Sequence, residues 1–261
     1  MMKLKKITYL SLTFLLFLLP ASAIHKLSSE AELFQVNGRD GFLMKASNST
    51  KDKPWVWYAP TLKNNPHQTQ KHYFDILLKQ GISIAGYDLG ECRGSAQSSI
   101  EFSKFYQTMV TKGYSQKPIL LGQSRGGLML LCWGFRNPEK VKAFVGIYPV
   151  CNLLSWPMKY GKQFVLKDYQ LSEEEFLQRL NEFNPSTNLK NLSKNNVPMF
   201  IIHGDSDKPV PYADNTAHIE KAYKALGGDV KVKIISGKGH AEIPEFFQDR
   251  DLLDFILTQK S

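Results

Sequence analysis

Apolar and polar residues are arranged along the chain in blocks that predict strands and helices in turn. Short apolar runs rich in β-prone residues are typical of buried strands, and longer blocks with an apolar residue at every third or fourth position are typical of helices. The predicted strands are residues 33–36, 42–44, 54–60, 82–87, 118–122, 143–148, 198–203 and 230–235. The predicted helices are about 67–80, 98–112, 212–226 and 245–258, with a further apolar run of helix length after Gly127.

This alternation predicts an α/β fold with a mainly parallel central sheet and helices on both faces. Residues 37–41 form a turn between the first two strands, so the sheet is expected to begin with an antiparallel hairpin. The rhythm is interrupted at about residues 149–197, which are polar and contain two helix-like pieces, near 157–167 and 172–183. We interpret this stretch as a small inserted cap.

The first 23 residues have the pattern of a secretory signal peptide. Three lysines precede an apolar run at residues 7–19, and an A-x-A-like motif ends at Ala23. The apolar run is short for a membrane span, so no stable membrane anchor is expected. The sequence therefore predicts one α/β domain, residues 24–261, that is secreted or periplasmic.

Charge and composition exclude some classes of partner. Removal of residues 1–23 takes away three lysines, so the formal charge falls from +9 to 30 − 24 = +6. The basic residues are spread along the chain without interleaved aromatic clusters, which argues against a nucleic-acid partner. The sequence does not indicate an oligomeric state.

The chain has three cysteines, so at least one thiol is free. Cys132 falls on the apolar face of the helix after Gly127, whereas Cys92 and Cys151 each follow a predicted strand. A disulfide between the latter two is compatible with the sequence, which does not establish it. None of the three has metal-ligand spacing, and no metal or organic cofactor is expected.

The motif G-x-S-x-G stands between a predicted strand and a predicted helix, with Ser124 at its centre. This is the context of a nucleophile elbow, a sharp turn that exposes the serine hydroxyl at the tip of the sheet. Gly122 and Gly126 allow strand and helix to approach each other closely. The N–H of Arg125 lies at the start of the helix, where it can stabilise an oxyanion.

A serine hydroxyl needs a base to accept its proton and an acid to orient that base. His240 and Asp207 lie in loops that follow two later strands, so the chain order is Ser124, Asp207, His240. Asp205 is the alternative acid, although an aspartate at that position also stabilises turns through its own hydrogen bonds. All of these residues are expected at the carboxyl edge of the sheet.

Five segments together resemble the α/β-hydrolase superfamily, and within it a group of secreted bacterial hydrolases. They are WVWYAPTL at 55–62, GQSRGG at 122–127, IYPVCN at 147–152, GDSDKPVP at 204–211 and GKGH at 237–240. The resemblance covers nearly the whole mature chain and implies the α/β-hydrolase fold. In the family the acid falls three residues after the loop glycine, which favours Asp207 over Asp205.

Further residues are expected around the serine. The second oxyanion donor should come from the loop after 54–60, where Pro60 has no N–H, so Thr61 is the first candidate and Leu62 the next. The side chains of Arg125 and Glu91 either form a structural ion pair or bind a substrate carboxylate or sugar hydroxyl. Trp156, in the cap, is a candidate substrate-binding residue or part of the core of the cap.

These residues predict a serine hydrolase that cleaves carboxylic esters through an acyl-enzyme. The resemblance suggests small-molecule or glycan esters as substrates, among them acyl groups on polysaccharides. One alternative is a peptidase, because the motif at 122–127 also resembles prolyl-oligopeptidase-like enzymes. The other is a non-catalytic binding protein on the same fold.

Overall fold

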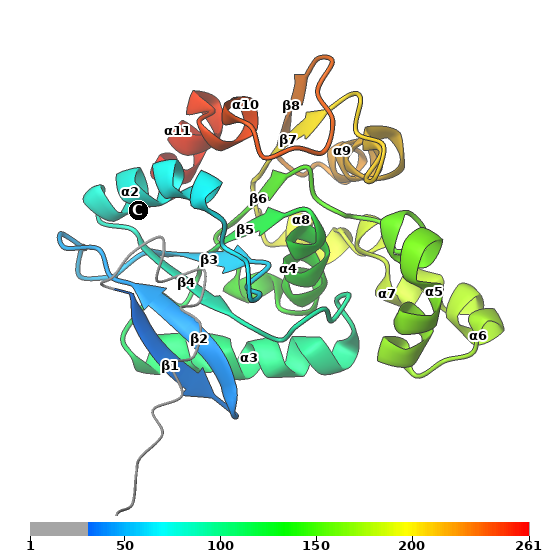
Figure 1. The fold of residues 1–261 in the computed structure, drawn as a ribbon, viewed down its shortest axis with the longest axis horizontal. Helices are drawn as coiled ribbons and strands as arrows, with labels where there is room; N and C mark the ends of the chain where they lie inside the picture. The colour runs from blue at the N-terminus through cyan, green and yellow to red at the C-terminus, as the bar shows by residue number, and fades with distance from the viewer. Residues whose placement is uncertain (1–30, 261) are drawn as a thin grey trace, which may run out of the picture.

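A computed structural model describes residues 31–260, and the predicted signal peptide lies outside this range. Eight strands form one sheet in the order β1-β2-β4-β3-β5-β6-β7-β8 (Figure 1). In chain order the strands are β1 (Glu32–Val36), β2 (Arg39–Met44), β3 (Trp55–Ala59), β4 (Ser83–Tyr87), β5 (Ile119–Gln123), β6 (Ala143–Ile147), β7 (Met199–Gly204) and β8 (Val230–Ile235).

The sheet is antiparallel at its start and parallel elsewhere. Strand β1 pairs with β2, and β2 with β4, in antiparallel register, whereas all pairs from β4 to β8 are parallel. Asn37 and Gly38 both have positive φ in the turn between the first two strands, as a tight hairpin requires. The predicted mainly parallel sheet with an N-terminal hairpin is therefore confirmed.

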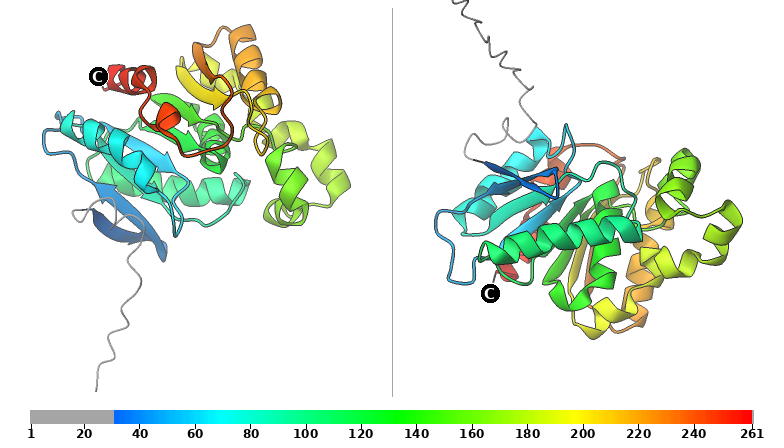
Figure 2. Two further views of the ribbon diagram at one scale, coloured as in Figure 1. Left: turned by 45° about the horizontal axis from the view of Figure 1, so that its top comes forward. Right: turned by 90° about the horizontal axis from the view of Figure 1, so that it is seen from below.

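Helices cover both faces of the sheet, and each face has its own hydrophobic core. One face packs against α2 (Lys71–Lys79), α10 (Pro244–Phe247) and α11 (Arg250–Thr258). The other packs against α3 (Ala96–Thr111), α4 (Arg125–Arg136) and α9 (Thr216–Ala225). Figure 2 shows α3 lying across this second face in its right-hand view. Because the central strands are covered on both faces, all residues of β3, β5 and β6 are buried.

Two predicted helices are interrupted, in each case at a polar residue. The block at 245–258 is divided into α10 and α11, because the Asp249 carboxylate accepts a hydrogen bond from Leu252 N and caps a new helix. The block at 212–226 begins with a 3-10 turn and breaks at Asn215. The side chain of Asn215 accepts from Cys151 N, so this residue is tied to the neighbouring loop.

The segment between β6 and β7 is mostly helical, and its first three helices lie beyond the sheet at the right of Figure 1, whereas its last helix lies beside α4. It contains α5 (Trp156–Tyr169), α6 (Glu173–Gln178), α7 (Leu180–Phe183) and α8 (Lys190–Lys194). Phe176 and Phe183 pack on Tyr169 to form a small aromatic core. Arg93, from the loop after β4, holds this segment against the rest of the molecule through an ion pair with Asp168 at 2.7 Å.

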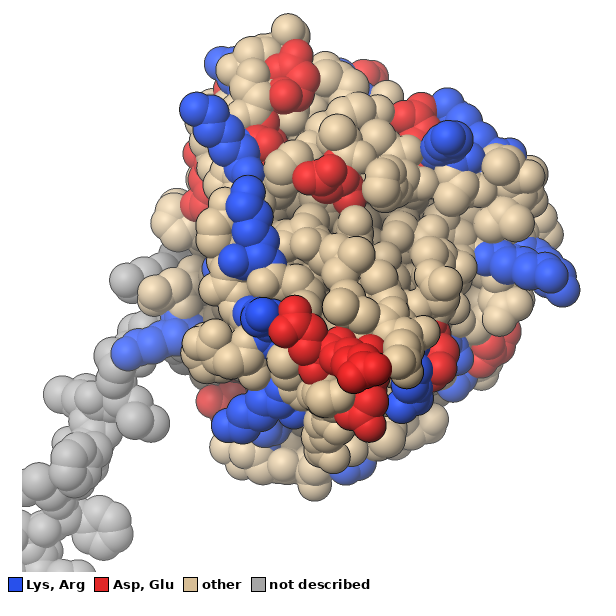
Figure 3. Space-filling model, turned by 90° about the vertical axis from the view of Figure 1, so that its right-hand side faces the viewer, with Lys and Arg blue, Asp and Glu red and all other residues tan. Residues whose placement is uncertain are grey.

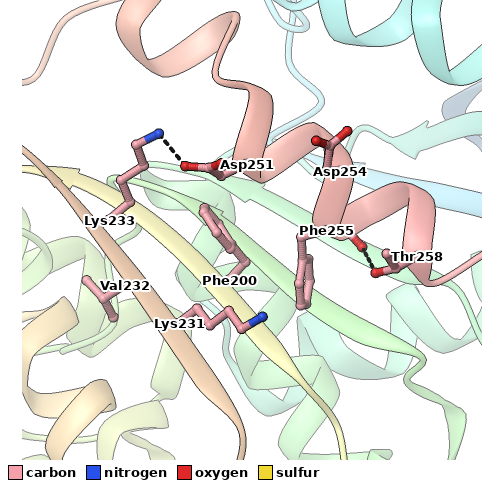
Figure 4. A pocket seen from close by; sticks show the side chains of 8 residues that line it. All are labelled: Phe200, Lys231, Val232, Lys233, Asp251, Asp254, Phe255 and Thr258. Carbon is pink, nitrogen blue, oxygen red and sulfur yellow. Dashed lines mark hydrogen bonds and ion pairs between the residues drawn. The ribbon is translucent and has the colours of Figure 1, made fainter.

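A groove with a cavity volume of about 520 Å³ lies between the edge strand β8 and α11 (Figure 4). It is lined by Phe200, Lys231, Val232, Lys233, Asp251, Asp254, Phe255 and Thr258. The groove takes its strand residues from Phe200, near the start of β7, and from 231–233 of β8, so it lies away from the loops after these strands that carry Asp207 and His240. Within residues 31–260, no helix has both the length and the apolar character needed to cross a bilayer.

Candidate active site

Ser124 has the backbone conformation of a nucleophile elbow. Its φ of 51° and ψ of −123° fall in a region that residues with a side chain rarely adopt. The turn is held by hydrogen bonds from Ser124 N to Ile147 O and from Val150 N to Ser124 O. These bonds tie the elbow to the end of β6, so the strained conformation is supported by the neighbouring strand.

The glycines of the motif are required by contact. A Cβ added to Gly126 would lie 2.0 Å from Ala59 O, and one added to Gly122 would lie 2.6 Å from Gly127 Cα. The first contact is between helix α4 and the end of β3, and the second is between β5 and α4. Only glycine allows these backbones to approach so closely.

Ser124, His240 and Asp207 form one chain of hydrogen bonds. The Ser124 Oγ–His240 Nε2 distance is 2.9 Å, and the His240 Nδ1–Asp207 Oδ2 distance is 2.7 Å. Because an ionised carboxylate only accepts hydrogen bonds, Nδ1 carries the proton and Nε2 is free to accept from the serine hydroxyl. This tautomer is the one that a general base needs.

Asp207 is held ionised in a buried site. Burial opposes its charge, but hydrogen bonds from His203 and His240, together with the Val210 N–H, outweigh this and lower the pKa of Asp207 to about 2. His203 is fully buried, with Nε2 2.8 Å from Val210 O and Nδ1 2.7 Å from Thr216 Oγ1. His203 therefore stabilises the loop that carries Asp207 from its buried side.

Asp205, the alternative acid, points elsewhere. Its carboxylate accepts hydrogen bonds from Gly237 N at 2.7 Å and from Ser206 Oγ at 3.0 Å. It therefore stabilises the turn between the acid loop and the histidine loop. Geometry assigns the contact with His240 to Asp207 alone.

The lowered pKa of Asp207 gives stability a pH dependence. A carboxylate whose pKa is about 2 when folded and 3.8 in its ordinary state stabilises the fold above pH 3.8, and this contribution is lost as the pH falls through 2. We expect about 2 kcal/mol from this residue at neutral pH. Urea unfolding of wild type and Asp207→Asn should show a difference that shrinks between pH 4 and pH 2. A constant difference over this range would contradict the shift.

The backbone N–H groups of Arg125 and Thr61 come from the two segments that meet at the elbow, since Pro60 N lies 2.4 Å from the position of an added Cβ on Gly126. Among residues 31–260, no loop or side-chain group accepts a hydrogen bond from either N–H. Arg125 N lies at the start of α4, where helix N–H groups are unpaired and favour negative charge. Leu62 N, by contrast, donates to Asn65 O at 3.2 Å. This leaves Thr61 as the available donor from the loop after β3.

The side chain of Arg125 is fixed at the mouth of the site. Its Nη1 lies 2.6 Å from Glu91 Oε2, and the guanidinium carbon lies 5.2 Å from the centre of the Trp156 ring. The side chain is nevertheless 41% exposed, so other N–H donors face solvent. Figure 3 views the molecule from the side of α5, where the centre of the face is hollowed and mostly uncharged.

The structure adds three residues near His240 that the sequence analysis did not select as site residues. The ring of Tyr148 lies 4.3 Å from the His240 ring, and Gln123 and Glu242 bond to each other at 3.2 Å beside it. Tyr148 follows the end of β6, as Ser124 follows β5, and that position is the one sequence signal that marks it. All three cysteines are free thiols, so Cys92 and Cys151 form no disulfide.

No group of three or more His, Cys, Asp or Glu side chains within residues 31–260 is arranged to hold a metal ion. The site instead offers a hydroxyl, an imidazole, a carboxylate and two backbone donors. Together these groups suit nucleophilic attack on a carbonyl and stabilisation of the resulting oxyanion.

Comparison with family models finds a match to the prolyl oligopeptidase family, Peptidase_S9, over residues 97–258. This range holds Ser124, Asp207 and His240. No curated protein sequence matches the chain.

Solved structures share the fold at low sequence identity. A putative dipeptidyl aminopeptidase IV from Bacteroides ovatus superposes with a TM-score of 0.65 at 19% identity, over 88% of this chain and 35% of that one. A puromycin-hydrolyzing peptidase of Mycobacterium tuberculosis gives 0.64 at 13%, over 87% and 38%. The chain thus spans little more than a third of these two proteins. Est1E from Butyrivibrio proteoclasticus gives 0.63 at 16%, over 88% of this chain and 98% of that one.

Proposed function

The chain belongs to the prolyl oligopeptidase family, and we propose that it is a serine hydrolase that cleaves carboxylic esters. The observation that carries this proposal is the chain of hydrogen bonds from Ser124 through His240 to Asp207. Ser124 stands on a strained elbow, at the start of a helix whose first N–H groups favour negative charge.

In the proposed reaction, Ser124 Oγ attacks the substrate carbonyl carbon while His240 Nε2 accepts the hydroxyl proton. Asp207 keeps His240 in the required tautomer and stabilises the imidazolium. The N–H groups of Arg125 and Thr61 hold the oxyanion, which collapses as His240 returns its proton to the leaving alkoxide. Water, deprotonated by His240, then releases the acyl group and restores the serine.

We place esters before peptides because of the chemistry of the leaving group. An alkoxide leaves more readily than an amine, so an ester makes smaller demands on substrate positioning. A peptidase is the second candidate, and the names of the structural relatives from Bacteroides ovatus and Mycobacterium tuberculosis support it.

Side chains on α5 and its neighbours are suited to binding the substrate. Trp156 and Tyr160 are one turn apart on α5, and Phe164 follows a kink at Gly161; Tyr160 and Phe164 are 59% and 49% exposed. The Arg125–Glu91 pair offers donors and an acceptor beside the first of them. Aromatic faces with such a pair fit the rings and hydroxyls of a glycan ester, the substrate class that we propose.

The choice between ester and peptide is tested by initial rates on matched substrates. A p-nitrophenyl ester and a p-nitroanilide with the same acyl group differ only in the bond that is broken. We expect measurable turnover of the ester and at least about 100-fold slower turnover of the anilide, equivalent to about 3 kcal/mol in the barrier. Turnover of the anilide within about 100-fold of the ester rate would favour the peptidase, because the weaker leaving group then costs the enzyme less than about 3 kcal/mol.

Arg125→Ala separates the role of the side chain from that of the backbone N–H, which the variant retains. If the guanidinium binds a substrate carboxylate, kcat/KM for an ester with a carboxylate in its acyl group should fall about 10-fold more than for its neutral methyl-ester analogue. Equal losses on both substrates would identify the Arg125–Glu91 contact as a structural ion pair.

A further inference from the structure

A buried polar network lies behind the proposed catalytic residues, on the face of the sheet that α2 and α10 cover. At its centre is Gln123, the last residue of β5 and the one before Ser124. Gln123 is 5% exposed, so each polar atom of its amide must find a partner within the protein. It makes four hydrogen bonds, the full capacity of the group.

The orientation of this amide follows from its partners. Its Nε2 donates to Glu242 Oε1 at 3.2 Å, and an ionised carboxylate only accepts. Nε2 also donates to the Tyr148 hydroxyl at 3.1 Å. On the opposite side, Oε1 accepts from the Tyr58 hydroxyl at 2.9 Å and from Gln70 Nε2. The amide is therefore held in one rotamer from both ends.

Tyr148 connects this amide to the imidazole. Its ring is 1% exposed and lies 4.3 Å from the ring of His240, with Phe246 packed edge-on against it at 5.1 Å. Its backbone has a positive φ of 35°, which directs the side chain under the histidine loop. The bond from Gln123 fixes the position of the hydroxyl, so the ring that lies against His240 cannot slide or swing to another χ1 rotamer without losing this bond.

Glu242 connects the same amide to the histidine loop. It lies two residues after His240 and binds Gln123 through one oxygen. Its other oxygen lies 2.6 Å from His67 Nδ1, in the segment before α2. The Gln123 amide thus bonds both to Tyr148, whose ring lies against the His240 ring, and to Glu242, in the loop that carries His240.

We propose that Gln123 is a positioning residue that couples the nucleophile to its base, acting on His240 through Tyr148 and Glu242. Gln123 thereby sets the position of the His240 imidazole in addition to filling space in the core. This inference rests on the proposed serine hydrolase function, in which His240 must stay within hydrogen-bond reach of Ser124 Oγ.

The test removes the contact of Gln123 with Tyr148 and its contact with Glu242 one at a time, by substitutions that leave no large cavity in the core. Tyr148→Phe deletes one hydroxyl, Glu242→Ala deletes the loop contact, and Glu242→Gln restores an acceptor for Gln123. Tyr223→Phe is the matched control, because that buried hydroxyl donates to Val197 O at 2.6 Å on the other face of the sheet. Each variant is assayed on a p-nitrophenyl ester, melted thermally, and examined by NMR for the low-field proton between His240 and Asp207.

We expect Tyr148→Phe and Glu242→Ala each to lower kcat about 10-fold with KM within about 2-fold, since a loosened imidazole loses part of the roughly 10²–10⁴-fold of base catalysis. Glu242→Gln should recover to within about 3-fold of wild type, and the low-field proton should broaden in the two damaged variants. Because both arms use one amide, the double variant should lose less than the product of the single losses. Tyr223→Phe should lower only the melting temperature.

Unchanged kcat and an unchanged low-field proton in Tyr148→Phe and Glu242→Ala would overturn the inference and leave a structural network. The NMR signal also separates this failure from failure of the proposed function. If wild type hydrolyses no ester but its low-field proton broadens or disappears in Tyr148→Phe and Glu242→Ala, the proposed activity is refuted and the positioning role of Gln123 is retained.

Discussion

Asp207→Asn is expected to lower kcat on an ester by about 10⁴-fold with little change in KM. The carboxylate accepts the Nδ1 proton of His240 at 2.7 Å. An amide in its place can turn its NH₂ group toward the ring, which moves the imidazole proton to Nε2. That nitrogen then cannot accept the proton of Ser124 Oγ, although it still lies close to it. Steady-state kinetics on the folded variant at neutral pH make the measurement.

Asp205→Asn is the matched control, because it changes the same atoms two residues away. Asp205 bonds to Gly237 N and Ser206 Oγ rather than to His240. We expect its kcat within about 5-fold of wild type, a loss of the size expected from one weakened turn bond. A large loss in Asp205→Asn with normal activity in Asp207→Asn would reverse the assignment of the acid.

Gly126→Ala is expected to destabilise the protein by at least about 3 kcal/mol. The added Cβ would lie 2.0 Å from Ala59 O and 2.4 Å from Pro60 N, both backbone atoms at the end of a buried strand. Neither can move without displacing β3 or the elbow, so the substitution separates α4 from the sheet. Urea unfolding should show a lower midpoint.

Gly134→Ala provides the comparison within the same helix. There the nearest atom to an added Cβ is a methyl group of Leu120 at 3.3 Å. The Leu120 side chain can move slightly and relieve this contact. The tight contact and the gain of about 1 kcal/mol in helix propensity act in opposite directions, so we expect a small net change. Similar losses in the two variants would show that the Gly126 contact does not fix the elbow.

The sequence predicted the sheet and its helices well because the signals are local. The apolar runs of β3, β5 and β6 are buried on both faces, as continuous apolar strands of a parallel sheet are expected to be. The elbow could be found because glycines are needed at 122 and 126 for close contact. Ser124, His240 and Asp207 could be grouped because parallel strands bring their carboxyl ends to one edge.

Other features depend on contacts between segments distant in the sequence. The break before α11 follows from capping by Asp249, and helical periodicity continues through it. The roles of Gln123 and Tyr148 depend on a hydrogen bond between the ends of two strands and on the return of the histidine loop over them. A single glutamine or tyrosine has no sequence pattern that shows which distant segment it will contact.

The most direct measurement is the intact mass of the purified protein after treatment with a fluorophosphonate probe, with Ser124→Ala treated in parallel. Such a probe reacts with serine hydroxyls that a neighbouring base has activated. An active site made of Ser124, His240 and Asp207 predicts one adduct on the wild type and none on the variant. No adduct on folded wild type, or an equal adduct on Ser124→Ala, would contradict it.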